Sequence, residues 1–170
     1  MKITNKHVLF WDGIFSNWHP VKDLIVEVNG EVISFPTSEH LFMYLKAIYF
    51  SDFDTAEQIK QATTPKEAKK LGRRVRGFKE SQWEEVRENF MYQSIDMKRR
   101  ADSNFEKELL KEEYRDKTFV EASPFDKVWG IGLKEDDLGA DNEEMWLGLN
   151  LLGKTLTKLR DDIIRDKESV

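Results

Sequence analysis

One helix that is apolar on nearly every side does most to constrain how this 170-residue chain can fold. In the stretch FPTSEHLFMYLKA (35–47), Pro36, Thr37 and Ser38 supply the end of a strand and a helix N-cap. From Leu41 onward the apolar residues occupy more than one helical stripe, a pattern typical of a buried helix. The sequence therefore predicts a core helix that the other elements must cover.

Around this helix the chain predicts an α+β fold that is predominantly helical, with a few short N-terminal strands. Strands are expected at 8–10, 23–28 and 31–35, the last two joined by the hairpin signal Asn29-Gly30. Further helices are expected at 54–62, 65–72, 82–101, 104–111 and 143–165. Three capping boxes support them, formed by Thr64 with Glu67, Ser81 with Glu84 and Ser103 with Glu106. Residues 112–142 should be mostly irregular, and irregular segments of that length are often functional.

Composition narrows the possible functions. No repeat or linker interrupts residues 1–170, so we expect a single domain. A net charge of -5 argues against non-specific nucleic-acid binding. The absence of cysteine excludes disulfides, thiolate metal sites and cysteine nucleophiles. With neither a signal peptide nor an 18-residue apolar run, we expect a soluble cytoplasmic protein without a membrane partner.

Two charges on the buried helix require an explanation. The residues three and four positions after Glu39 are Phe42 and Met43, so Glu39 has no ordinary helical ion pair with them. Seven residues return a helix to within about 20° of its starting direction, so Glu39 and Lys46 share a face. Burial would free the Lys46 amine for Schiff-base chemistry, with Glu39 as general acid or base. In the competing interpretation Glu39 caps the helix or pairs with an arginine, and Lys46 extends to solvent.

Other candidate sites are weaker. The acidic run KEDDLGADNEE (134–144) lacks the spacing of a calcium loop and is interpreted as a solvated loop, so we expect no metal. The cluster RRVRG (73–77) could bind phosphate or simply complement a helix C-terminus. His40 is interpreted as a hydrogen-bonded buried histidine. WGIGL (129–133) lacks the third glycine of a dinucleotide fingerprint, and no serine nucleophile elbow exists.

Six blocks in order resemble the NADAR family of YbiA-like N-glycosidases. They are FSNW (15–18), FPTSEHLFMYLKA (35–47), AKKLGRRVRGF (68–78), WEEVRENFM (83–91), FVEASPFDKVWGIGL (119–133) and WLGLNLLGKTLTKLR (146–160). The resemblance implies a hydrolase that cleaves the N-glycosidic bond between a phosphorylated ribose and a nitrogen base. The base would belong to a ribosylaminopyrimidine intermediate of riboflavin synthesis or to an ADP-ribosylated guanine, free or in nucleic acid. It implies no cofactor and no obligate protein partner.

The resemblance also assigns residues. Implied catalytic residues are Glu39, Lys46, Asp126 and Trp129, and implied substrate-binding residues are Asn17, Arg73, Arg74, His40 and Gly130. Leu41, Leu45 and Ile131 depart from the usual family pattern, and these departures concern recognition of the base.

Two mechanisms and a second class of function remain open at this point. Lys46 could capture C1 of the sugar as an imine that water then hydrolyses, or Glu39 and Asp126 could divide acid and base duties without a covalent step. Alternatively, the same pocket could serve a binding module that senses ADP-ribose or NAD-like nucleotides without turning them over.

Overall fold

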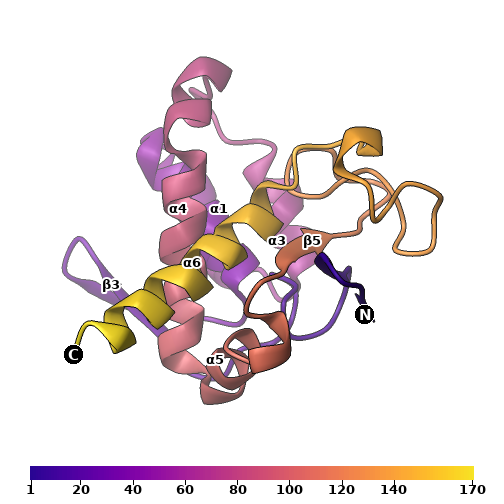
Figure 1. Cartoon of the computed structure of the whole chain (residues 1–170). Helices are drawn as coiled ribbons and strands as arrows, with labels where there is room; N and C mark the ends of the chain where they lie inside the picture. Colours follow the sequence, from indigo (N-terminus) through magenta and orange to yellow (C-terminus); the bar gives the residue numbers. More distant parts are fainter. The chain divides into compact units, whose positions relative to one another are not determined.

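The computed structural model describes all 170 residues and is an α+β structure dominated by helices (Figure 1). The chain divides into two compact units. One comprises residues 17–103, and the other comprises residues 1–16 together with 104–170. None of the helices is both long and apolar enough to cross a bilayer.

The unit of residues 17–103 is built around the predicted buried helix, α1 (Ser38–Tyr49). Strands β3 (Leu24–Val28) and β4 (Glu31–Phe35) form the antiparallel hairpin predicted from Asn29-Gly30, and both turn residues have positive φ. Helices α2 (Phe53–Gln61), α3 (Pro65–Gly72) and α4 (Glu80–Ala101) each pack against α1, which explains its lack of a polar face.

The N-caps in the structure can be compared with the three predicted capping boxes. The Thr64 hydroxyl accepts the Glu67 N–H at 3.2 Å, so the first predicted box is confirmed. The second is wrong, because α4 begins before Ser81, with Lys79 at its N-cap. Helix α5 (Ser103–Leu109) begins at Ser103 itself, and the short 3-10 helix η1 (Glu112–Tyr114) follows it.

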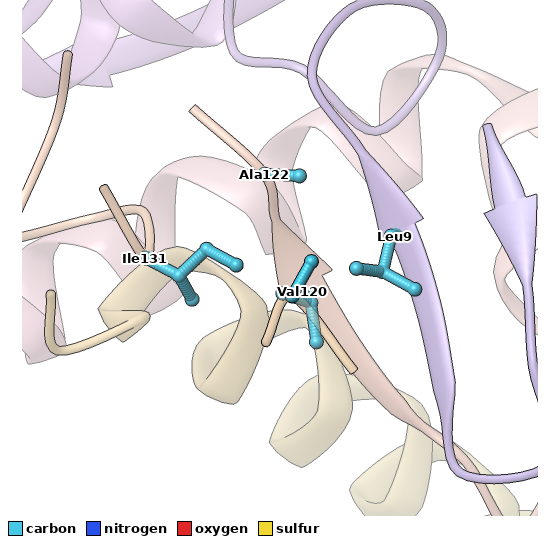
Figure 2. Close-up of a cluster of buried hydrophobic side chains, with 5 residues drawn as sticks. Leu9, Val120, Ala122 and Ile131 are labelled. Atoms are coloured by element: carbon cyan, nitrogen blue, oxygen red, sulfur yellow. The ribbon is translucent and has the colours of Figure 1, made fainter. Parts of the chain in front are cut away.

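The second unit contains a three-stranded sheet of β1 (Lys2–Ile3), β2 (His7–Phe10) and β5 (Thr118–Glu121). Strands β2 and β5 are parallel, with His7 opposite Thr118, and α6 (Leu151–Glu168) packs against β5. Figure 2 shows part of the core formed where β2 and β5 pair. Its buried members are Leu9, Val120, Ala122, Ile131 and Ala140.

Helix α6 starts eight residues later than predicted, and its place is taken partly by the 3-10 helix η2 (Glu143–Met145). Backbone N–H groups of residues 147 and 149–152 donate to carbonyls of residues 127–131 instead of forming a helical turn. Asn150, the N-cap of α6, has φ 54°, and its buried side chain bonds the backbone of Glu121 and Phe119 in β5. Long-range pairing therefore replaces the expected first two turns of the helix.

Candidate active site

Glu39 is held in the first turn of α1 by a junction centred on Asn17. The backbone carbonyl of Asn17 accepts the Glu39 N–H at 3.1 Å. The Asn17 side chain accepts from the Ser38 hydroxyl at 2.9 Å and donates to the Met91 sulfur at 3.2 Å. Both Asn17 and Glu39 are buried, and this junction holds the backbone of Glu39 at the start of α1. Asn17 thus has a clear positioning role, and its contact with substrate stays a prediction.

Lys46 lies in the last turn of α1, and its side-chain nitrogen contacts two aromatic rings. The Nζ atom is 4.6 Å from the Phe78 ring centroid and 5.5 Å from that of Trp83. Burial lowers the pKa of Lys46; the charge of Glu39 opposes this effect, and the charge of Arg73 adds to it. The amine is therefore neutral more often than that of an exposed lysine.

An aromatic wall surrounds this amine and was not predicted as part of the site. Trp83 on α4 stacks on Phe90 with an interplanar angle of 20° and contacts Phe42 and Phe50. Phe78 contacts Phe50. The only signal in the sequence was that Trp83 and Phe90 lie seven residues apart on one predicted helix. These rings help to bury the amine, and burial disfavours the ammonium form, while the faces of Phe78 and Trp83 attract that form and offset the effect in part.

The arginine cluster divides into two functions. Arg73 and Arg74 are exposed just after α3, and Arg73 is near enough to act on the Lys46 pKa. Arg76 instead bonds the carboxylates of Asp52 and Asp54, at 3.1 and 2.8 Å. Of the two interpretations left open for this cluster, the ion pairs of Arg76 favour a structural role for that residue.

His40 is fully buried, and both of its ring nitrogens have partners inside the protein. Nδ1 lies 2.7 Å from the Thr37 hydroxyl, and Nε2 lies 3.0 Å from the Ala62 carbonyl oxygen. The interpretation of a hydrogen-bonded buried histidine is confirmed. These two contacts support a structural role for His40, and its contact with substrate stays a prediction.

A second lysine with a perturbed amine serves as a useful comparison. Burial lowers the pKa of Lys98 on α4 to about 7, and attraction to Asp102 offsets this only in part. Lys98 is completely buried, however, whereas Lys46 retains access to solvent. Of these two lysines, only Lys46 combines a lowered pKa with access for a ligand.

Asp126, Trp129 and Gly130 belong to the unit that contains β5. The Asp126 Oδ1 atom accepts the backbone N–H groups of Val128 at 2.9 Å and Trp129 at 2.8 Å, so this carboxylate shapes the loop that carries Trp129. Gly130 is buried, and a Cβ atom there would lie 2.8 Å from the Glu121 carbonyl oxygen. This close approach explains why a glycine is needed at position 130 for packing. Contact of Gly130 with substrate stays a prediction.

Carboxylates of the acidic segment 134–144 engage separate partners. Asp141 contacts His7 Nδ1 and the Thr4 hydroxyl, each at 2.6 Å, and Asp137 accepts the Lys134 N–H at 2.8 Å. No group of three or more metal-ligating side chains is present in the structure. The segment is a largely exposed loop, as expected, and Asp141 joins it to His7.

The chain has relatives among curated proteins. Among curated proteins, the chain is 35% identical to N-glycosidase R617 of Acanthamoeba polyphaga mimivirus, over 94% of this chain and 97% of that protein. It is 34% identical to Protein irg-1 of Caenorhabditis elegans, over 94% of this chain and 81% of that one. It is also 32% identical to a Zea mays chloroplastic protein named Riboflavin biosynthesis protein PYRR, over 91% of this chain but only 24% of that protein.

The fold has a solved counterpart as well. The NMR structure of the E. coli protein YbiA matches 99% of this chain and 91% of its own, with a TM-score of 0.71 and 26% identity. The NADAR domain model matches residues 9–164, which include Glu39, Lys46, Asp126 and Trp129. The chain therefore belongs to the NADAR domain family.

Proposed function

We propose that this protein is an N-glycosidase that cleaves the C–N bond between a phosphorylated ribose and a nitrogen base. One observation carries the proposal: α1 presents a buried carboxylate, Glu39, and an accessible amine of lowered pKa, Lys46, within electrostatic reach of each other. An acid or base beside an activated amine is what imine-forming hydrolysis of a ribosylamine requires. The mimivirus relative, which is named an N-glycosidase, supports the same reaction class.

In the proposed reaction, Glu39 assists proton transfer as the sugar ring opens and the base departs. The neutral Lys46 amine attacks C1, the C1–N bond to the base breaks, and the base leaves with a proton on its nitrogen. Lys46 and C1 are then joined as a protonated imine. Water adds to C1, the Lys46–C1 bond breaks, and the free sugar leaves, so that one water is consumed for each bond cleaved.

The aromatic wall contributes by disfavouring the ammonium form of Lys46. At the usual lysine pKa only about one amine in a few thousand is neutral at pH 7, so lowering the pKa directly raises the concentration of nucleophile.

Asp126 and Trp129 are proposed to assist by stabilising positive charge or activating water, and by stacking on the base or lining the ribose. Their support is the match to the family motif, together with the turn through which Asp126 orients the backbone of Trp129. Arg73 and Arg74 are proposed to attract the phosphate, since both are exposed guanidiniums and Arg73 acts electrostatically on Lys46.

For the substrate we propose a ribosylaminopyrimidine 5-phosphate or an ADP-ribosylated guanine. The maize relative is named for riboflavin biosynthesis, which favours testing the ribosylaminopyrimidine first. Both candidates contain a phosphorylated ribose, and in both the reaction takes place at C1 of that ribose.

Borohydride trapping tests the covalent step. The protein is incubated with each substrate and sodium borohydride, digested, and examined by mass spectrometry. We expect a reduced sugar adduct on Lys46 and none on Lys98, and we expect the Lys46→Arg variant to give neither adduct nor product. Turnover by the wild type without any adduct would show that the covalent step is wrong and would favour direct hydrolysis by carboxylates.

A substrate panel separates an enzyme from a binding module. Ribosylaminopyrimidine phosphates, NAD, ADP-ribose and ADP-ribosylated guanosine are each incubated with the protein, and released sugar and base are measured by chromatography. We expect release of base from at least one N-glycoside. Tight binding without any released base would contradict the proposed hydrolysis and favour the sensor function.

A further inference from the structure

Arg87 on α4 has a buried donor that the protein leaves without a partner. Its side chain is only partly exposed, and the Nε atom is fully buried without a hydrogen-bond acceptor. Leaving a buried donor of a charged group unpaired costs roughly 1 to 3 kcal/mol or more. Very few such groups occur in a folded protein, so this one calls for a physical reason.

The position of Arg87 on α4 points to the active site. Residues four apart lie on the same helical face, so Arg87 is one turn from Trp83 and one turn from Met91. Trp83 contacts the Lys46 amine, and Met91 accepts a hydrogen bond from Asn17, the residue that positions Glu39. Arg87 therefore lies on α4 between the residues that contact the two ends of the catalytic helix.

Helix geometry also sets the direction expected for the Arg87 side chain. Helical side chains lean toward the N-terminus of their helix, which directs Arg87 toward Trp83 and hence toward the Lys46 end of the site. Arg73 acts electrostatically on Lys46 in this unit, and Arg87 would add a further positive charge at the Lys46 end of the site. A region with this balance of charge is suited to an anionic ligand.

We propose that Arg87 binds the phosphate attached to C5 of the substrate ribose, an inference that rests on the proposed function and adds a direct phosphate ligand to the exposed Arg73 and Arg74, which attract the phosphate. A phosphate oxygen accepts from the Nη groups, and a small rotation of the side chain lets the orphaned Nε donate to a second oxygen. Two parallel N–H donors match two phosphate oxygens, which is a geometry that lysine cannot reproduce. The phosphate belongs either to a monoester, as in ribose 5-phosphate, or to the diphosphate of ADP-ribose.

A purely structural function for Arg87 predicts a different behaviour. A structural arginine stabilises the fold, so its removal should lower the unfolding temperature. An arginine retained for a ligand leaves an unsatisfied donor in the free protein, and replacing it with an apolar side chain of similar length removes that cost. Arg87→Met should therefore unfold at the same temperature as the wild type or at a higher one.

The test measures binding separately from turnover. Titration calorimetry with ribose 5-phosphate, ribose and ADP-ribose is performed on the wild type, Arg87→Met and Arg87→Lys. The matched control is Arg100→Met, which removes the same charge from the same helix at a position paired with Asp96 on the surface. Kinetics with an N-glycoside are measured with and without its 5-phosphate.

We expect Arg87→Met to weaken ribose 5-phosphate binding about 30-fold, the equivalent of one charge-assisted hydrogen-bond pair. KM for the phosphorylated substrate should rise by a similar factor, with kcat within about twofold, and the unphosphorylated substrate should be unaffected. Arg87→Lys should recover only part of the loss, and Arg100→Met should match the wild type. If Arg87→Met weakens the binding of ADP-ribose alone, the group that Arg87 binds is the diphosphate. If it weakens the binding of both ADP-ribose and ribose 5-phosphate, that group is the C5 phosphate that the two ligands share.

Two failures are distinguishable. If ribose 5-phosphate binds through Arg87 but no N-glycoside is cleaved, the proposed hydrolysis is wrong and the phosphate site stands. If N-glycosides are cleaved and Arg87→Met leaves both binding and KM unchanged, or if it merely lowers the unfolding temperature, the phosphate site is wrong and the hydrolysis stands.

Discussion

The Lys46 side-chain nitrogen lies 4.6 Å from the centroid of the Phe78 ring. The face of the ring attracts the ammonium form, while burial disfavours it, so Phe78 partly opposes the lowering of the Lys46 pKa. Phe78→Leu keeps an apolar cover without the ring and should lower that pKa further. We expect the rising limb of kcat/KM against pH to move to lower pH in this variant.

Replacing Arg73 should move the same limb in the opposite direction. The Arg73 charge helps to lower the Lys46 pKa, so Arg73→Met should raise it and reduce the neutral amine available at pH 7. We expect a loss of about threefold in kcat at pH 7, which disappears at alkaline pH, since an exposed charge acts through a high dielectric. A loss of equal size at every pH would contradict the electrostatic explanation and indicate lost substrate contacts alone.

Glu39→Gln should separate chemistry from folding. Glutamine keeps the size of the side chain and the backbone N–H that bonds Asn17, but it cannot transfer a proton. We expect kcat to fall by about 100-fold or more, the usual contribution of a general acid or base. Thermal unfolding should change little, and unchanged turnover would remove Glu39 from the catalytic residues.

Asp52 should dominate the acid sensitivity of its unit. Burial raises the pKa of this carboxyl, but hydrogen bonds from Arg76 and Thr55 outweigh burial and hold it well below 3.8. A lowered folded pKa stabilises the protein above pH 3.8, and this contribution is lost as the pH falls from 3.8 toward the folded value. Asp52→Asn should cost about 2 kcal/mol in unfolding free energy at pH 7.

Chemical unfolding at several pH values checks this prediction. The difference between Asp52→Asn and the wild type should be constant from pH 5 to 7 within experimental error and should narrow below about pH 4. Asp54→Asn is the control, because Asp54 contacts Arg76 from an exposed position. A difference in unfolding free energy that stays constant down to pH 2 would contradict the lowered pKa of Asp52.

Two variants of Asp126 distinguish its turn from its proposed chemistry. In Asp126→Asn the amide oxygen can still accept the N–H groups of Val128 and Trp129, whereas Asp126→Ala leaves both donors unpaired. We expect Asp126→Ala alone to be destabilised, by about 1 kcal/mol, and both variants to lose activity. Full activity in Asp126→Asn would show that the residue acts only through the turn.

The sequence predicted those features that local chemistry determines. The Asn29-Gly30 hairpin, the Thr64 cap and the buried helix α1 each depend on residues a few positions apart, and each is confirmed. The expectation that Glu39 and Lys46 interact also follows from helix geometry alone. It agrees with the effect of Glu39 on the Lys46 pKa.

Features that depend on distant residues were not predictable in this way. Strand β5 pairs with β2, and the segment before α6 bonds the loop at 127–131, so helix propensity at 143–150 is overridden by these contacts. Likewise, nothing near Arg76 in the sequence shows that Asp52 will pair with it. Trp83 was recognisable as a helical aromatic, but its contact with Lys46 depends on how α4 packs against α1.

The parallel pairing of β2 with β5 has a consequence for biosynthesis. His7 leaves the ribosome early, and its partner Thr118 appears only after residues 17–103 have been made. The unit of residues 17–103 contains its own core helix and hairpin, so we expect it to fold first while β2 waits without its parallel partner. The exposed edge of a waiting β2 makes the nascent chain, rather than the finished enzyme, the state most dependent on chaperones.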